Sequence, residues 1–196
     1  MKNVGILGGS FNPIHIAHIK LAKLAIKEAK LDEVIIIPTF LTNLKDNSSL
    51  VSPEHRLKMC NLAVENENDI YVSDIDIRRN KITYTSDTIY ELKQIENNNY
   101  FLIMGADSYK NLSLWHDYQY IVSNAKIIVA RRDDISKSDI LDIAKKNSFD
   151  IPVILSKPIQ DLSSTIIRYN IKNDITVSEL LDKKVLEYIK INNLYR

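Results

Sequence analysis

The chain has 196 residues, of which 45% are hydrophobic, and its 26 Lys and Arg residues nearly balance its 25 Asp and Glu residues, for a formal net charge of +1. This balance argues against a protein that coats nucleic acid or lies on a membrane surface, because both need an excess of basic charge. The length suits one α/β domain and is short for two, so we expect a single domain over residues 1–196.

No segment predicts secretion or membrane insertion. The first residues lead into an apolar strand without a charged leader, and no apolar run approaches the about 20 residues that span a bilayer. Cys60 is the only cysteine, which excludes an internal disulfide. We therefore expect a cytoplasmic protein that binds neither membrane nor nucleic acid, and the sequence leaves open whether copies form a homo-oligomer.

Strand-like and helix-like segments alternate along the chain. The run 34–37 is β-branched throughout and typical of a strand buried on both faces. Ser52-Pro53-Glu54 opens a helix with a capping serine and an early proline, and the polar run 85–87 is expected to cap another. The expected strands are 4–7, 34–37, 70–72, 100–104, 126–130 and 152–155, and the expected helices are 19–30, 53–64, 85–95, 138–147, 164–171 and 177–191.

This alternation predicts an α/β fold, a single-domain doubly wound (Rossmann-like) parallel sheet with helices on both faces. The last helices form a C-terminal helical part at about 163–192. In such a sheet, ligands bind beyond the carboxyl ends of the strands. Loops that follow strands are therefore where we expect the functional residues.

The loop after the first strand is the first such candidate. Gly8 and Gly9 let the backbone turn sharply and approach a ligand closely. The start of the following helix offers free N–H groups and the positive end of a helix dipole, which favour an anion. His15 and His18, three residues apart, lie on one face of that helix start and can point at the same ligand.

The same two histidines could be half of a metal site. The other His and Cys residues of the chain are His55, His116 and Cys60, which supply no evident partners. A closed zinc site is therefore not expected, and we predict no metal held by the protein. Neither a G-x-G-x-x-G pattern nor a G-x-x-x-x-G-K-[ST] pattern is present, which argues against a dinucleotide fingerprint or a P-loop.

Two motifs carry a resemblance to a known superfamily. The run G-G-S-F-N-P-I-H-I-A-H at 8–18 resembles the signature G-x-[ST]-F-[DN]-P-x-H-x-G-H of the nucleotidylyltransferases, and L-S-S-T-I-I-R at 162–168 resembles their second element, [IS]-S-S-T-x-[IL]-R. Members of this superfamily join a nucleoside triphosphate to a phosphorylated acceptor and release pyrophosphate. The two motifs occur in the expected order.

Two further stretches resemble one branch, the nicotinate mononucleotide adenylyltransferases. Residues 76–88 resemble the branch stretch E-x-x-R-x-G-x-S-Y-T-x-D-T. The segment G-A-D-S at 105–108, followed by Leu112 and Trp115, resembles the branch's G-x-D segment and its downstream L-x-x-W. The resemblance extends from the first strand to Arg168. It implies ATP, with Mg²⁺ on its phosphates, and nicotinate mononucleotide as the small-molecule substrates.

The resemblance also assigns site residues. It implies that His15, His18 and Arg168 are catalytic, because they would stabilise the charge on phosphate oxygens. It implies that the nicotinate ring stacks on Trp115, while Thr85 and the N–H of His116 hold the carboxylate. The residues implied to bind ATP or phosphate are Gly8, Gly9, Ser10, Phe11, Lys45, Ser163, Ser164 and Thr165, and those implied to bind the nicotinate nucleotide are Thr85, Asp107, Trp115 and His116.

Several alternatives stay open at this point. Asp107 could bind a ribose hydroxyl or cap a helix, and Trp115 could be a core or surface aromatic. Ala17 replaces a motif glycine, and only Lys45 remains of the branch's P-P-H-K segment, so Lys45 is equally compatible with a solvated loop. The acceptor could be a different phosphate compound such as phosphopantetheine, or the chain could be a catalytically weak nucleotide-binding module.

Overall fold

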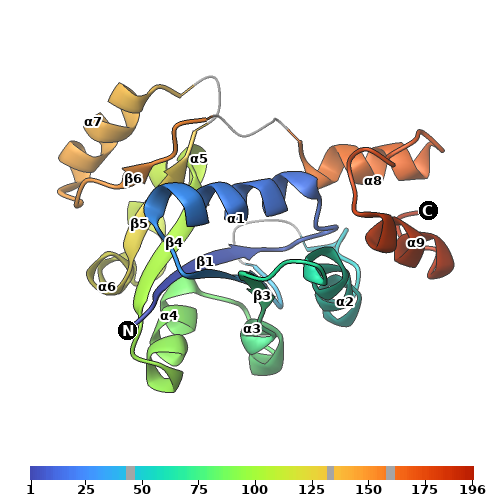
Figure 1. The fold of residues 1–196 in the computed structure, drawn as a ribbon, viewed down its shortest axis with the longest axis horizontal. Helices are drawn as coiled ribbons and strands as arrows, with labels where there is room; N and C mark the ends of the chain where they lie inside the picture. The colour runs from blue at the N-terminus through green and yellow to red at the C-terminus, as the bar shows by residue number, and fades with distance from the viewer. Residues whose placement is uncertain (43–46, 132–134, 158–161) are drawn as a thin grey trace.

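The computed structural model describes residues 1–42, 47–131, 135–157 and 162–196, and these residues form one six-stranded sheet (Figure 1). All neighbouring strands pair in parallel, in the order β3-β2-β1-β4-β5-β6. This is a doubly wound order that reverses between β1 and β4, so the predicted fold class is confirmed. The strands are β1 Asn3–Gly9, β2 Glu33–Pro38, β3 Ile70–Val72, β4 Asn99–Gly105, β5 Lys126–Ala130 and β6 Val153–Ile154.

Helices cover both faces of the sheet, and Figure 1 shows α1 on one side with α3 and α4 on the other. The buried residues of α1, α2, α8 and α9 share one hydrophobic core with the sheet, and those of α3 to α7 share a second core. The helices are α1 Ile16–Ala29, α2 Pro53–Val64, α3 Ile75–Arg79, α4 Thr85–Ile95, α5 Ala106–Lys110, the 3-10 turn η1 Leu112–Leu114, α6 Tyr118–Asn124, α7 Lys137–Asn147, α8 Ser164–Lys172 and α9 Lys183–Ile191.

Apart from their first residues, the central strands are apolar because both of their faces are covered. In β4, Phe101 and Ile103 belong to the core beneath α1, whereas Leu102 and Met104 belong to the opposite core. Successive side chains of a strand point to opposite faces, so a strand between two helix layers needs hydrophobic residues at every position. The carboxyl ends of β1, β2, β4 and β5 then meet at one edge of the sheet.

Most predicted elements are present, and the differences lie at their ends. The helix opened by Ser52 is confirmed, because its hydroxyl accepts a hydrogen bond of 3.4 Å from the N–H of His55. The expected cap at 85–87 is wrong, since α4 begins at Thr85 and its N-cap is Tyr84, without a side-chain cap. The expected helix at 177–191 is wrong in its first part, because α9 begins only after Asp182, whose carboxylate accepts from the N–H of Lys184.

Four short helical segments were not predicted: α3, α5, η1 and α6. Each is three to seven residues long, which is too short to show a helical hydrophobic period. The helix α3 follows β3 and leads into α4, whereas α5 follows β4 and leads through η1 and α6 to β5. No described helix has the length and apolar character needed to cross a membrane.

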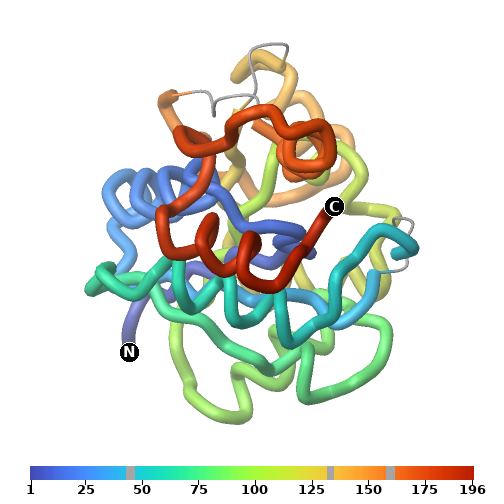
Figure 2. Tube along the Cα trace, turned by 90° about the vertical axis from the view of Figure 1, so that its right-hand side faces the viewer, coloured from blue at the N-terminus to red at the C-terminus, as the bar shows by residue number. Residues whose placement is uncertain are grey.

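The C-terminal helices return to the start of the chain. In Figure 2 the C-terminal segment lies beside α2, and α9 packs against that helix. The backbone N–H of Ile16, at the start of α1, donates to the carbonyl of Leu180 over 3.1 Å. The last 35 described residues thus contact the same loop and helix start that the glycine motif builds.

Candidate active site

Two adjoining cavities open at the carboxyl edge of the sheet, where the strand order reverses between β1 and β4. Their volumes are about 390 Å³ and about 340 Å³. Residues of the loop after β1 line both cavities, so ligands in the two cavities would lie next to each other. The residues that line both cavities are Gly8, Gly9, Ser10, His15, His18, Thr42 and Leu162.

The first, larger cavity is apolar toward the sheet and aromatic at its outer end. Ends of the strands supply Ile37, Met104 and Ala130. The outer end is formed by the start of α4 with the residue before it and by the end of η1 with the residues after it, which supply Tyr84, Thr85, Leu114, Trp115 and His116. The rings of Tyr84 and His116 lie 4.3 Å apart with a tilt of 38°. An aromatic, half-polar slot of this kind suits a flat ring that carries one polar group.

The second cavity is polar and lies at the N-terminus of α8. The Ser163 hydroxyl caps this helix by accepting from the N–H of Ile166 at 3.3 Å, and the Ser164 hydroxyl donates to the Pro13 carbonyl at 2.9 Å. Arg168 donates through Nη1 to the Asn12 carbonyl at 2.9 Å, so its guanidinium is held against the glycine loop. A helix N-terminus, hydroxyls and a guanidinium together favour an anion with several oxygens.

His15 and His18 lie at the junction of the two cavities. Their rings are stacked, with centroids 3.7 Å apart and an angle of 25° between the planes. Burial lowers the pKa of His15 to about 4, and burial together with the neighbouring His15 lowers the pKa of His18 well below its usual range. Both imidazoles are therefore neutral at pH 7, and each can donate one N–H.

The hydrogen bonds fix which nitrogen of His18 carries the proton. Its Nδ1 lies 3.2 Å from the backbone N–H of His15 and accepts from it, so the proton of the neutral ring is on Nε2. Within the described part of the chain, the buried Nδ1 of His15 and the buried Oγ1 of Thr39 have no hydrogen-bond partner. Buried polar atoms without a partner are rare in folded proteins, and both of these residues line the first cavity.

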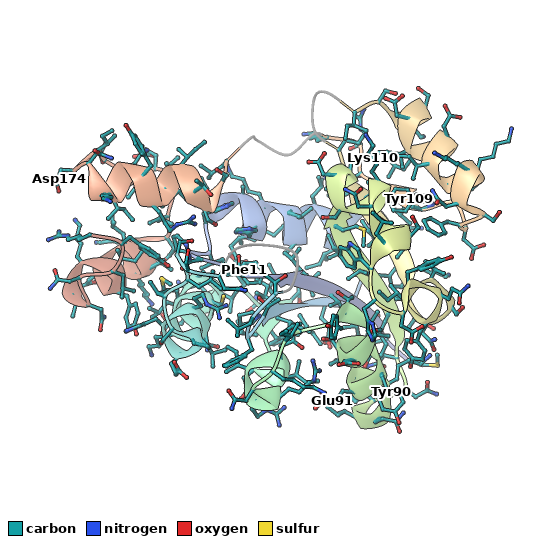
Figure 3. All side chains as sticks on the ribbon, turned by 180° about the vertical axis from the view of Figure 1, so that it is seen from behind. Phe11, Tyr90, Glu91, Tyr109, Lys110 and Asp174 are labelled. Carbon is teal, nitrogen blue, oxygen red and sulfur yellow. The ribbon has the colours of Figure 1, made fainter. Side chains whose placement is uncertain are left out.

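The glycine loop is shaped by Phe11, which Figure 3 labels near the middle of the molecule. Phe11 is buried with a left-handed φ of 45°, and its ring meets that of His18 edge-on at 5.0 Å. A Cβ on Gly9 would lie 3.1 Å from the Phe11 ring, whereas a Cβ on Gly8 would meet no atom within 4 Å. The Phe11 side chain thus supports the loop, and Gly8 leaves bare backbone toward the cavities.

Similarity to known proteins extends over nearly the whole chain. Residues 6–170 match a family model described as cytidylyltransferase-like. A "Probable nicotinate-nucleotide adenylyltransferase" of Borrelia garinii subsp. bavariensis is 43% identical over 193 residues, which are 98% of this chain and 94% of that protein. The chain belongs to the nicotinate-nucleotide adenylyltransferase family. The resemblance seen in the sequence motifs is therefore confirmed.

Other members of the family cover the chain to a similar extent. A relative of the same name from Fusobacterium nucleatum is 38% identical over 189 residues, 95% of this chain and 96% of that protein. Among solved structures, "Plasmodium falciparum nicotinic acid mononucleotide adenylyltransferase complexed with NaAD" matches with a TM-score of 0.82 and 20% identity, over 100% of this chain and 98% of that one. At that identity the solved structure supports the fold alone.

Most residues that the family resemblance assigns lie at the two cavities. Thr85, Trp115 and His116 line the first. The second is lined by Phe11, Ser163, Ser164, Thr165 and Arg168, and both are lined by Gly8, Gly9, Ser10, His15 and His18. The structure therefore brings together groups from four separate stretches of the sequence. Their individual roles remain predictions.

Two of the assigned residues are not placed at the cavities. Asp107 is exposed, is the second residue of α5 and lines neither cavity, and the N-cap of that helix is Gly105. Its neighbour Ser108 lines the first cavity instead. Lys45 lies outside the described residues. Ala17, which replaces the motif glycine, is buried and lines the first cavity, so its methyl group narrows that space.

Sequence reasoning missed a buried carboxylate at the first cavity. Asp76 is 2% exposed, accepts a hydrogen bond of 2.6 Å from the Thr88 hydroxyl and forms an ion pair of 3.1 Å with Arg79. Burial raises its pKa to about 6, against the opposing effects of Thr88 and Arg79. Its position inside the branch motif could have marked it, but a motif alone does not show that a side chain faces a cavity.

Proposed function

We propose that this member of the family transfers the adenylyl group of ATP to nicotinate mononucleotide, giving nicotinate adenine dinucleotide and pyrophosphate in NAD biosynthesis. One observation carries the proposal: an aromatic cavity and an anion-favouring cavity meet at two neutral histidines. Curated relatives named for this activity, at 33% to 43% identity over nearly the whole chain, support the choice of substrates.

The reaction needs no nucleophile from the protein. The 5′-phosphate oxygen of nicotinate mononucleotide attacks the α-phosphorus of ATP, the bond from that phosphorus to the bridging oxygen breaks, and pyrophosphate leaves with the electron pair. Catalysis of such a transfer rests on positioning the two phosphates and on stabilising the charge that spreads over their oxygens. A junction between two cavities is the geometry that this chemistry requires.

The histidine pair would act at the reacting phosphates. Because both rings are neutral, they would donate N–H hydrogen bonds to phosphate oxygens and would not transfer protons. Nε2 of His18 is the defined donor, since its Nδ1 is occupied by the His15 backbone. Donors that are fixed before the reaction need no rearrangement as charge develops in the transition state.

The second cavity would hold the phosphates of ATP and the leaving pyrophosphate. Arg168 would bind them with the N–H groups that Asn12 does not occupy, and the start of α8 would add hydroxyls and backbone donors. The described residues include no group of three or more His, Cys, Asp and Glu side chains that could hold a metal ion. Mg²⁺ would therefore enter as part of the ATP substrate, coordinated by phosphate and water, and would neutralise phosphate charge there.

The first cavity would bind the nicotinate ring. Trp115 offers a flat face to a cationic pyridinium, which adds a cation–π attraction to the stacking. Thr85 and the backbone N–H of His116 are neutral donors, and hydrogen bonds from neutral donors to a carboxylate are among the stronger ones. An amide in place of the carboxylate would make weaker bonds at the same positions.

The proposal is tested by measuring pyrophosphate release from ATP and Mg²⁺ with nicotinate mononucleotide, nicotinamide mononucleotide or phosphopantetheine as the acceptor. We expect strong release with the nicotinate compound and little with the others. An Arg168→Ala variant that remains folded should lose about 100-fold in turnover. Release only with phosphopantetheine would overturn the acceptor assignment, and no release with any acceptor would favour a nucleotide-binding module without this activity.

A further inference from the structure

A buried arginine lies behind the glycine loop. Arg56, in α2, has an exposed fraction of 0%. Its guanidinium donates four hydrogen bonds, all to backbone carbonyls: Nε to Val51 at 3.1 Å, Nη1 to Ser10 at 2.9 Å and to Thr39 at 2.6 Å, and Nη2 to Phe40 at 2.8 Å. Four of the five N–H groups of the side chain are thus occupied.

The positive charge of Arg56 has no carboxylate in ion-pair contact among the described residues, although the charge of Glu54, in the same helix, acts to raise its pKa. Among residues 1–42, 47–131, 135–157 and 162–196, no carboxylate forms an ion pair with it. Burial lowers the pKa of Arg56, but a guanidinium stays protonated in proteins. A buried charge normally has a counter-charge, because removing it from water is costly. An unpaired one at this position would favour a negative ligand nearby.

The four carbonyls belong to three segments that form the site. Ser10 follows β1, Thr39 and Phe40 follow β2, and Val51 precedes α2. Ser10 lines both cavities and Thr39 lines the first. Arg56 therefore joins two neighbouring loops at the carboxyl edge of the sheet through a single planar group, although Arg56 itself lines neither cavity.

The bond to Ser10 also fixes the direction of a backbone donor. In a trans peptide the carbonyl and the following N–H point in opposite directions. Because the Ser10 carbonyl points at Arg56, the N–H of Phe11 points away from Arg56. Ser10 and Phe11 both line the second cavity, where the phosphates of ATP are proposed to bind.

We propose that Arg56 is a positioning residue for the phosphate site: its guanidinium orients the Ser10–Phe11 peptide and the loop after β2, and its unpaired charge favours the anion that these loops bind. This inference rests on the proposed function, since it takes the phosphates of ATP and pyrophosphate as the anion. Because Arg56 lines neither cavity, it would not touch a substrate bound there. It acts through the backbone that lines the cavities.

Two variants separate the two parts of this role. Arg56→Lys keeps the charge but places its donors on one nitrogen, which cannot reach four carbonyls in a plane. Arg56→Gln removes the charge. The matched control is Lys58→Gln, which removes one positive charge from an exposed position of the same helix. The measurements are the affinity for pyrophosphate by calorimetry, which needs no turnover, and kcat and KM for ATP.

We expect Arg56→Lys to bind pyrophosphate within about threefold of wild type and to lose roughly 100-fold in kcat, because displaced loops misplace the reacting groups. Arg56→Gln should lose at least about tenfold in pyrophosphate affinity, with a similar rise in KM for ATP, and Lys58→Gln should match wild type. If folded Arg56→Gln and Arg56→Lys both bind and react like wild type, Arg56 serves the fold alone and the inference is wrong.

If Arg56→Gln does not fold, Arg56→Lys alone still tests the inference. Unchanged kcat and KM in Arg56→Lys would overturn the positioning role, because the planar set of hydrogen bonds is then dispensable. Failure of the proposed function is seen separately, as wild-type protein that releases no pyrophosphate from ATP and nicotinate mononucleotide. Pyrophosphate affinity would still test Arg56 in that case.

Discussion

The hydroxyl of Tyr195 donates a hydrogen bond of 2.9 Å to Oδ1 of Asn12, although 183 positions separate the two residues. The Asn12 side chain also donates to the Ser49 carbonyl at 2.9 Å and accepts from the N–H of Val51 at 3.2 Å, and the Asn12 carbonyl accepts from Arg168. Asn12 thus connects the glycine loop to the segment before α2, to α8 and to the C-terminal segment.

Removing the Tyr195 hydroxyl should therefore leave Asn12, and the residues of the second cavity that it contacts, less firmly positioned. Burial raises the pKa of this hydroxyl, so it remains a donor at all ordinary pH values. Tyr195→Phe keeps the ring and should lower the free energy of unfolding by about 1 kcal/mol. Because Asn12 and Arg168 line the second cavity, we expect KM for ATP to rise several-fold while KM for nicotinate mononucleotide stays the same.

Tyr169→Phe is the matched control, since that tyrosine is exposed on α8. Tyr169→Phe should change neither KM for ATP nor KM for nicotinate mononucleotide. Steady-state kinetics with each substrate varied in turn, together with urea denaturation, provides the comparison. Equal rises in both KM values for Tyr195→Phe would indicate a general loss of structure and would contradict a role confined to the phosphate side.

The two ends of the first cavity can be tested by substitutions that remove one interaction each. Thr85→Val removes a hydroxyl at nearly constant volume, and a hydrogen bond to a charged group contributes about 1.5–3 kcal/mol. KM for nicotinate mononucleotide should therefore rise roughly 10- to 100-fold. KM for nicotinamide mononucleotide should change little, because that acceptor has no carboxylate for Thr85 to bind.

Trp115→Leu should behave differently, because the indole face binds the ring and not the carboxylate. Both pyridine nucleotides should lose affinity, by about 1–2 kcal/mol each, and KM for ATP should stay constant. Kinetics of both variants with both acceptors provides the test. If Thr85→Val weakened the two acceptors equally, the carboxylate would not be bound at Thr85.

The glycine loop, the histidine pair and the serine–threonine motif could be predicted because each is a contiguous run of residues. The six strands could be predicted for a similar reason, since buried strands are continuous apolar runs. Arg56 could not, because an arginine close to the charged, exposed residues Glu54 and Lys58 is expected at the surface, and only the packing of α2 behind the loop buries it.

Tyr195 and Asp76 were missed for related reasons. The bond from Tyr195 to Asn12 spans nearly the whole chain, and no local pattern indicates such a contact. Asp76 lies in an unpredicted short helix, so its direction could not be read from periodicity. Asp107 shows that a matching motif does not fix which side chain faces a cavity, because Asp107 is exposed while its neighbour Ser108 lines the first cavity.

The buried histidines predict how stability depends on pH. The pKa of His15 is about 4 in the folded chain and 6.5 ordinarily, so between pH 6.5 and 4 the unfolded chain binds a proton that the folded chain does not. The free energy of unfolding should therefore fall as the pH falls through this window, by up to about 1.4 kcal/mol per pH unit. The lowered pKa of His18 acts in the same direction.

The titration of Asp76 changes the free energy of unfolding in the opposite direction. Its pKa is about 6 in the folded chain and 3.8 ordinarily, so between pH 6 and 3.8 the folded chain holds the extra proton and gains stability as the pH falls. Asp76→Asn should thus lose stability more steeply than wild type on acidification, and His15→Ala less steeply. Urea denaturation at pH 7.5, 6, 5 and 4.5 measures the slopes. A shallower slope for Asp76→Asn would show that its carboxyl is not buried as described.

Alanine substitutions at the two glycines of the loop should affect stability and activity differently. A Cβ on Gly8 meets no atom within 4 Å, so Gly8→Ala should change the free energy of unfolding by less than about 0.5 kcal/mol. Its methyl group would stand in the space shared by the two cavities and displace the reacting phosphates. We expect kcat/KM to fall about 100-fold in a protein of normal stability.

Gly9→Ala should show a different pattern, because its Cβ would lie 3.1 Å from the ring of Phe11. That ring is buried and contacts His18, so it can yield only by disturbing the core, at a cost of about 1–3 kcal/mol. Thermal denaturation of the two variants beside their kinetics distinguishes the cases. A Gly8→Ala protein with wild-type kinetics would mean that the ligands do not approach the loop at Gly8, and the phosphates would then have to bind nearer the start of α8.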